Sequence, residues 1–226
     1  TRMGRHVGKV VAERMGRSLL ELGGNNAVIV DQSANLDLTT KAVTFAAVGT
    51  AGQRCTTTRR LIAHESIVDD IVARLTRAYS TIRIGDPLKE GTLVGPLITP
   101  KAVEGFEHAI KTAIDQGGTL ITGGKRIAGP GNFVEPAIIR APASNRLPIS
   151  QEETFAPILY VFTFKTVAEA IAMNNAVDQG LSSAIFTDSV RSSEAFLAPW
   201  GGVLAETSRT IDRRDDGTSV TVTDYL

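Results

Sequence analysis

The sequence has only one cysteine in its 226 residues, so the chain cannot form an internal disulfide. Basic and acidic residues number 24 each, which leaves no net charge to attract nucleic acid or an anionic membrane surface. No apolar run approaches the roughly 18 residues that cross a bilayer. The basic N-terminus has no apolar segment of the signal-peptide kind. We therefore expect a cytoplasmic protein with neither a nucleic-acid partner nor a membrane partner.

The residues that are present favour a layered α/β domain. Apolar residues make up 42% of the chain, which is ordinary for a globular core. Apolar residues at helical spacing predict helices at 3–14, 36–48, 67–78, 100–116 and 166–174. Short apolar runs predict strands at 18–21, 27–30, 57–63, 119–122, 134–139, 159–164 and 183–186. This alternation indicates a largely parallel sheet flanked by helices.

Two of these helices carry start signals. Ser66 and Asp69 have the spacing of a capping box, and Thr99 followed by Pro100 is typical of a helix N-terminus. In the second of these helices we expect four residues to face inward, namely Val103, Phe106, Ile110 and Ile114.

The two ends of the chain differ from the rest. There is no initiator methionine, and the first residues have the pattern of a helix interior, so we expect the chain to begin inside a larger protein. From about Gly201 onward the sequence is rich in charge, serine and threonine, with few apolar residues. We expect this tail to be poorly ordered or weakly docked.

The cysteine lies in the run VGTAGQRCTTTRR, residues 48–60. Small residues precede Cys55, and the run falls where a predicted helix gives way to a predicted strand, so we expect an accessible loop. Arg54 beside it would help to hold a thiolate or an anionic substrate group. A lone cysteine is more often a small buried hydrophobe, and at this point both interpretations stay open.

Two acidic segments are further candidates. Glu21 follows the apolar run SLL and precedes Gly23 and Gly24, which would place its carboxylate at the edge of a cleft. A carboxylate partly buried there is a good base near neutral pH, although a single glutamate in a turn is usually a surface residue. The run QEETFAP, residues 151–157, would offer a carboxylate to hydroxyl groups and a ring to a flat heterocycle.

Together these segments resemble the aldehyde dehydrogenase superfamily. The resemblance is carried by ELGGNN at 21–26, GQRCT at 52–56 and EETFAPIL at 152–159, in the family's order and spacing. GPLIT at 95–99, GGK at 123–125, GNFVEPAI at 131–138 and GLSSAIFT at 180–187 support it. Asn25 with Asn26 replaces a usual lysine, and Ala156 replaces a usual glycine. These changes are similar to the antiquitin-like branch, which oxidises α-aminoadipic semialdehyde in lysine degradation.

The resemblance implies an organisation and a reaction. Residues 1–23 would end a Rossmann-type cofactor domain, 24–201 would form the catalytic domain, and 202–226 would be a divergent tail. Cys55 would be the nucleophile that forms a thiohemiacetal and then a thioester. Glu21 would be the base for thioester hydrolysis. The reaction is the NAD-dependent oxidation of an aldehyde to an acid, with NADP left open.

The resemblance also implies binding residues. Glu153 would contact the nicotinamide ribose and Phe155 the nicotinamide ring, with Leu22 and Gly23 beside them. Arg54 and Thr56 would contact the far end of a small aldehyde substrate. Family members form homo-oligomers, and the state of this chain stays open.

Departures from the family leave other functions open. Of the family's phosphate-binding Gly-Ser-Thr only Thr1 is present, and the oxyanion-holding asparagine lies upstream of the part covered, so the activity of the chain alone stays open. One alternative is an inactive α/β module. Another is a thiol acyltransferase or hydrolase without nicotinamide, but neither His64 nor His108 has an evident partner acid. The scattered histidines give no metal-binding pattern.

Overall fold

An eight-stranded sheet with the order β3-β4-β5-β2-β1-β6-β8-β7 forms the centre of the molecule. The computed structural model describes residues 1–198, 209–213 and 219–224. The central strands are mutually parallel: β4 (Ala137–Arg140), β5 (Ile158–Phe164), β2 (Thr58–His64), β1 (Asn26–Val30) and β6 (Ser182–Thr187). Antiparallel strands flank them: β3 (Thr119–Thr122) on one side, β8 (Ser219–Asp224) and β7 (Arg209–Arg213) on the other. The predicted α/β class with a largely parallel sheet is confirmed.

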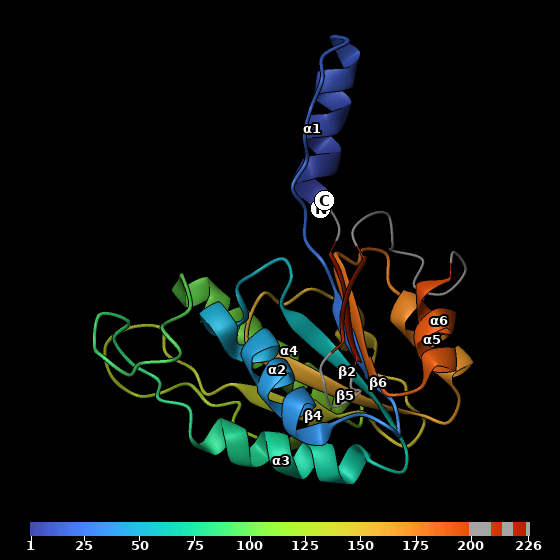
Figure 1. Ribbon diagram of the computed structural model, residues 1–226. Coiled ribbons are helices and arrows are strands. Elements are labelled where there is room, and N and C mark those ends of the chain that lie inside the picture. Colours follow the sequence, from blue (N-terminus) through green and yellow to red (C-terminus); the bar gives the residue numbers. More distant parts are fainter. Residues whose placement is uncertain (199–208, 214–218, 225–226) are drawn as a thin grey trace.

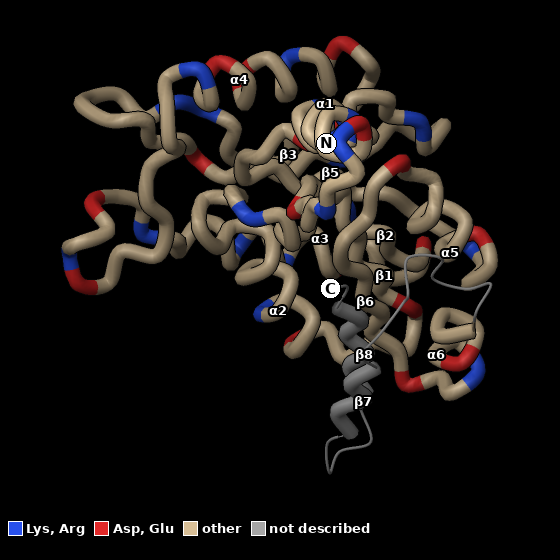
Figure 2. The backbone as a smooth tube through the Cα atoms, turned by 90° about the horizontal axis from the view of Figure 1, so that it is seen from above, with Lys and Arg blue, Asp and Glu red and all other residues tan. Residues whose placement is uncertain are grey.

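Helices cover both faces of this sheet. Helices α2 (Leu36–Val48) and α3 (Val68–Ser80) pack together on one face, and α5 (Val167–Asn175) and α6 (Val190–Leu197) pack together on the other (Figures 1 and 2). The strands between them are buried on both sides, which is why β1 and β2 are continuous buried runs rather than alternating ones. The described helices include none long and apolar enough to cross a membrane.

Helix α4 (Pro100–Asp115) packs at the β3 end of the sheet. Its predicted start is confirmed, because Thr99 Oγ1 accepts a hydrogen bond from the Ala102 amide at 3.2 Å. Val103, Phe106 and Ile110 are buried as expected. Ile114 is 47% exposed, so its predicted inward position is wrong. Ala109 and Ala113 are the other buried residues of α4, since a repeat of 3.6 residues carries residue 114 off the buried face.

Other predictions need correction. Helix α3 begins at Val68 without a side-chain cap, because the Ser66 hydroxyl is hydrogen-bonded to His64 Nδ1 at 2.8 Å, so the capping box is wrong. β4 begins at Ala137 rather than at residue 134, and only an isolated bridge pairs Val134 with Arg126. Helix α6 was not predicted from the sequence.

An arm stands away from the sheet (Figure 1). Helix α1 (Arg2–Glu13) runs outward, and the chain returns beside it as an extended segment. This segment is not the strand predicted at 18–21, because it pairs with no other strand. Gly4 and Gly8 leave room on the helix for the side chains of Leu22 and Leu20. The arm exposes large apolar side chains at Met3, Val7, Val10, Met15, Leu19 and Leu20.

The C-terminal tail takes part in the sheet where it is described. β8 pairs with the whole length of β6, and β7 pairs with β8. The low apolar content of these segments predicted little order there, so that prediction is wrong for the two strands. The rest of the predicted tail, 202–208, 214–218 and 225–226, lies outside the described residues.

Candidate active site

The loop before the cysteine has an unusual backbone conformation. After α2 ends at Val48, a 3-10 turn (Gly49–Gly52) contains three consecutive residues in the left-handed region: Thr50 at φ 54°, Ala51 at 53° and Gly52 at 69°. A side chain on Gly52 would overlap the backbone of Ala156 and Pro157. Glycine at this position therefore lets two loops touch, and strain of this kind concentrates at functional sites.

Cys55 follows this turn and precedes β2, as predicted. Its thiol is free and half-buried, so the alternative of a fully buried cysteine does not hold. The amide of Cys55 makes no hydrogen bond with any described residue. It is therefore available to an oxyanion that forms beside the sulfur.

Asn26 fixes the backbone from Cys55 to Thr57, a role that was not predicted from the sequence. Its Nδ2 donates to the carbonyl oxygens of Cys55 at 2.7 Å and Thr57 at 2.9 Å. Its Oδ1 accepts from the amides of Leu181 at 3.0 Å and Ser182 at 2.8 Å. Asn26 is 2% exposed, so these four bonds satisfy its whole buried amide. Its place two residues after Gly24, at the start of a buried strand, was the available signal.

Glu21 lies on the returning segment at the foot of the arm. It is exposed, so the partial burial expected from the sequence is wrong; an unpaired extended segment offers nothing to cover it. Glu21 nevertheless lines the same cleft as Cys55. The two candidate groups are thus brought to one cavity, with Glu21 open to water.

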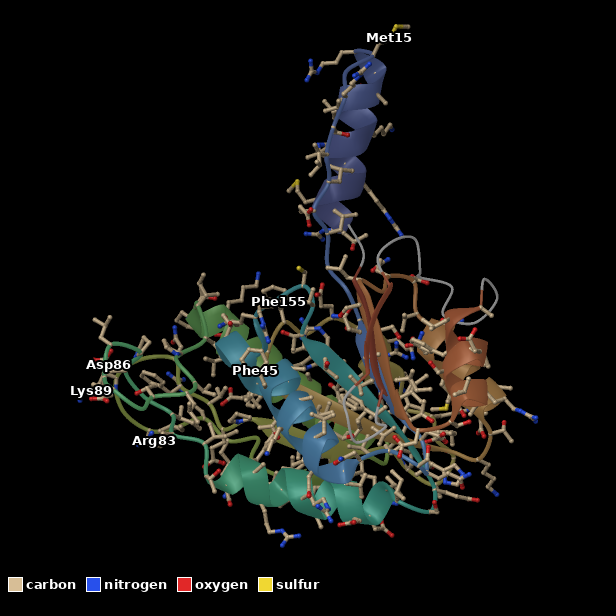
Figure 3. All side chains as sticks on the ribbon, viewed as in Figure 1. Met15, Phe45, Arg83, Asp86, Lys89 and Phe155 are labelled. Carbon is tan, nitrogen blue, oxygen red and sulfur yellow. The ribbon has the colours of Figure 1, made fainter. Side chains whose placement is uncertain are left out.

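Glu153 and Phe155 lie opposite this segment. One carboxylate oxygen of Glu153, Oε1, accepts from the Gly24 amide at 3.0 Å and from Arg59 Nη2 at 3.3 Å. Phe155 has a φ of 56°, which is rare for an aromatic residue, and its side chain is 39% exposed. It lies near the foot of the arm, whereas Met15 marks the tip (Figure 3). Both residues line the cleft, and the Glu153 carboxylate is held by the Gly24 amide and Arg59.

Leu22 and Gly23 complete this side of the cleft. Leu22 fills the space over Gly4 of α1, and any side chain on Gly23 would collide with the second carboxylate oxygen of Glu153. The missing side chain leaves a cradle of backbone and carboxylate, with Phe155 beside it. A flat ring with an attached ribose fits that combination, so the residues present suit the nicotinamide end of a dinucleotide.

The two predicted substrate residues lie on the other side of the cysteine. Thr56 is exposed. The Arg54 guanidinium lies 5.1 Å from the Phe45 ring centre, and its Nη2 donates to the Phe45 carbonyl at 3.4 Å. Arg54 lines the cleft but is turned toward α2 rather than toward the thiol, since the aromatic ring and the carbonyl attract the cation.

Arg59 is a second residue that the sequence analysis missed. It lies on β2 four residues after Cys55, and its side chain is 3% exposed. Burial lowers the pKa of Arg59 below its usual value, and the Glu153 carboxylate opposes this shift. Arg60 next to it is also buried, and burial lowers its pKa to about 10. Arg59 lies behind the candidate site, where it contacts Gly52, Arg54 and Glu153, whereas Arg60 donates to other carbonyl groups.

All the predicted site residues border one cleft of about 800 Å³ at the foot of the arm. They are Glu21, Leu22, Gly23, Arg54, Cys55, Thr56, Glu153 and Phe155. Thr1 and Met3 at the start of α1 line it as well, whereas the three histidines do not. Within the described residues, no group of His, Cys, Asp and Glu could hold a metal ion. A thiol, an exposed carboxylate and a ring-binding cradle therefore share one cavity.

Comparison with known proteins finds relatives that are aldehyde dehydrogenases. The chain is 50% identical over 201 residues to aldehyde dehydrogenase family 7 member A1 of Brassica napus. The matched region covers 89% of this chain and 40% of that relative. It is 52% identical to alpha-aminoadipic semialdehyde dehydrogenase of Mus musculus, covering 89% of the chain and 37% of that relative. The chain thus spans about 40% of the length of the curated relatives it matches.

Solved structures show the same likeness. Lactaldehyde dehydrogenase from Escherichia coli superimposes with a TM-score of 0.83 at 32% identity, covering 88% of this chain and 42% of that one. Betaine aldehyde dehydrogenase from Staphylococcus aureus in complex with NAD+ gives 0.83 at 29% identity, covering 89% and 40%. The model of the aldehyde dehydrogenase family matches residues 1–204. With nearly the whole chain matched, this protein belongs to the aldehyde dehydrogenase family.

Proposed function

We propose that this chain supplies the nucleophile and the base for nicotinamide-dependent oxidation of an aldehyde to a carboxylic acid. The observation that carries the proposal is the shared cleft, which Cys55, Glu21, Glu153 and Phe155 line together. A semialdehyde such as α-aminoadipic semialdehyde is the proposed substrate. It is supported by the names of relatives that are 52% identical over 201 residues.

The first step is attack of the Cys55 thiolate on the aldehyde carbon. A carbon–sulfur bond forms, and the carbonyl oxygen becomes an oxyanion. The Cys55 amide, which has no partner among the described residues, donates to that oxyanion. Asn26 holds the Cys55 carbonyl at 2.7 Å and so fixes the peptide bond that follows Cys55. The product is a thiohemiacetal.

A bound nicotinamide ring would supply the acceptor for the hydride, with its two electrons, that leaves the thiohemiacetal carbon as the thioester forms. Glu21 then takes a proton from a water molecule, which attacks the thioester carbon. The carbon–sulfur bond breaks, the acid leaves, and the thiolate is restored. The exposure of Glu21 suits this role, because the base must reach water and later release its proton.

The cleft also supports a division of the binding residues. Glu153, Phe155, Leu22 and Gly23 would hold the nicotinamide end, as their cradle suggests. Thr56 and Arg54 would meet the far end of the substrate, with Arg54 swinging away from Phe45. The alternative of a thiol hydrolase has no support in the cleft, since no histidine lines it beside Cys55.

Two variants test the proposal. Cys55→Ala should abolish NADH formation, since no thiohemiacetal can form. Glu21→Gln should permit one burst of NADH per active site and slow the later steady rate by about 10²–10⁴-fold. Stopped-flow absorbance of NADH with saturating aldehyde measures both phases. Loss of the burst in Glu21→Gln would place Glu21 before hydride transfer, and full activity in Cys55→Ala would overturn the proposal.

A further inference from the structure

One guanidinium group lies where three loops of the candidate site meet. Arg59 Nε donates to the Gly24 carbonyl at 3.2 Å. Its Nη1 and Nη2 donate to the Gly52 carbonyl at 3.4 and 3.5 Å, and Nη2 also donates to the Arg54 carbonyl at 3.2 Å. The same Nη2 lies 3.3 Å from Glu153 Oε1. Every nitrogen of this cation therefore has a partner.

The partners belong to segments far apart in the sequence. Gly24 ends the segment that carries Glu21, Gly52 and Arg54 precede Cys55, and Glu153 belongs to the third motif. The guanidinium also lies 5.4 Å from the centre of the Phe155 ring. A single planar cation thus fixes the base segment, the nucleophile loop and the cofactor-side loop relative to one another.

The chemistry of this position requires arginine. Burying a cation is unfavourable unless its donors are satisfied, and here three carbonyl dipoles and one carboxylate satisfy them. Lysine has a single nitrogen at its tip and cannot reach oxygens on opposite sides of a planar fork. A neutral side chain would leave three buried carbonyl groups and the Glu153 carboxylate without this donor.

We propose that Arg59 is a positioning residue that sets the Glu153 carboxylate and the Phe155 ring at the correct place relative to Cys55. This inference rests on the proposed function, because Glu153 and Phe155 matter only if they hold a nicotinamide. It adds a residue from outside the three motifs, and one that does not itself line the cleft.

Arg60 provides a matched control. It is the next residue on β2, is 2% exposed, and donates to the carbonyls of Met173 at 2.6 Å, Asn25 at 2.9 Å and Asn174 at 3.0 Å. None of its hydrogen bonds reaches Glu153. Removing either cation disturbs the fold, but only the removal of Arg59 should change what Glu153 contributes to binding.

The experiment is a pair of double-mutant cycles with nicotinamide mononucleotide as the probe. Dissociation constants are measured by NMR titration for wild type, Arg59→Met, Arg60→Met, Glu153→Gln and the two double variants. We expect Arg59→Met and Glu153→Gln each to raise the dissociation constant about tenfold. The double variant should have a dissociation constant no higher than that of the single variant that binds less tightly. For Arg60→Met and Glu153→Gln, the fold-change in the dissociation constant of the double variant should equal the product of the two single fold-changes. Arg59→Lys, which keeps the charge, should weaken binding less than Arg59→Met.

The outcomes separate the two levels of the proposal. If the effects of Arg59→Met and Glu153→Gln multiply while wild type binds, the role of Arg59 is overturned and the proposed function stands. If wild type binds neither nicotinamide mononucleotide nor NAD+, the proposed function falls, and the inference falls with it. Where Arg59→Met does not fold, the same cycle with Arg59→Lys decides between these outcomes.

Discussion

A single amide side chain holds the backbone that follows Cys55 in place. Asn26 uses both of its donors and both acceptor sites in bonds of 2.7–3.0 Å to backbone groups of two loops. We expect Asn26→Ala to lower the free energy of unfolding by about 3 kcal/mol, because four backbone groups lose a partner and some stay buried. Urea denaturation followed by circular dichroism measures this change.

Asn132 serves as the control for that prediction. Its side chain makes no hydrogen bond with a described residue, so Asn132→Ala should change the free energy of unfolding by no more than about 0.5 kcal/mol. Equal losses for both variants would mean that the Asn26 bonds contribute nothing specific.

At the scale of residues, the sequence located the groups that border the cleft but not those behind it. Cys55, Glu153 and Phe155 could be located because each lies within a short motif of consecutive residues. Asn26 meets Cys55 across 29 residues, and Arg59 meets Glu153 across 94. Spacing in sequence carries no information on such pairs. The side-chain direction of Arg54 was also beyond prediction, since it depends on the Phe45 ring of a different element.

At the scale of elements, the turn between α2 and β2 is constrained by its contact with another loop. Gly52 has a φ of 69° and touches the backbone of Ala156 and Pro157. We expect Gly52→Ala to destabilise the protein by more than 2 kcal/mol, on the order of the strain plus overpacking costs, and to distort the Cys55 loop. Thermal and urea unfolding give the stability.

Gly105 gives the matched comparison. It lies in α4 with nothing within 4 Å of the place its side chain would occupy. Gly105→Ala should therefore raise the free energy of unfolding by about 0.5–1 kcal/mol, because alanine is the better helix former. A Gly52→Ala protein as stable as wild type would contradict the close contact of the two loops.

Most elements were predictable because their apolar residues keep a local period. Helix α2 has the predicted bounds, since both its apolar period and its Asn35 cap are encoded within the segment. The secondary-structure predictions that failed are those in which a contact with another residue determines the local conformation. Residues 18–21 look like a strand, yet Leu20 packs on Gly8 of α1 and Leu19 is exposed. Ser66 looks like a cap, yet its hydroxyl bonds to His64.

At the scale of the whole molecule, the class of the sheet was predictable but the strand order was not. Alternation of helices and strands gives a parallel sheet without saying that β6 crosses back to lie beside β1. The arm adds a feature that periodicity alone misses. Its helix is amphipathic, yet Met3, at 70% exposed, and Val10, at 47%, face solvent. Such a surface favours association of the chain at high concentration.

The arm and the cleft together limit what this 226-residue chain can hold. The described residues offer a carboxylate and an aromatic ring to the nicotinamide end, and Thr1 at the start of α1 borders the same cleft. No described strand lies beside α1 to hold an adenosine. A charge-assisted hydrogen bond and one apolar contact contribute about 2–4 kcal/mol, which corresponds to millimolar or weaker binding.

We therefore expect this chain to bind NAD+ and nicotinamide mononucleotide with similar, weak affinity. No described strand lies beside α1 to hold the adenosine half of NAD+, so the two dissociation constants should agree within about threefold, near 1 mM or above. NMR titrations of the same protein sample measure both, with adenosine monophosphate as the control that should bind more weakly still. Micromolar NAD+ binding, or adenosine monophosphate binding as tight as that of NAD+, would contradict this prediction. Either result would place an adenosine site on the chain that the cleft residues do not account for.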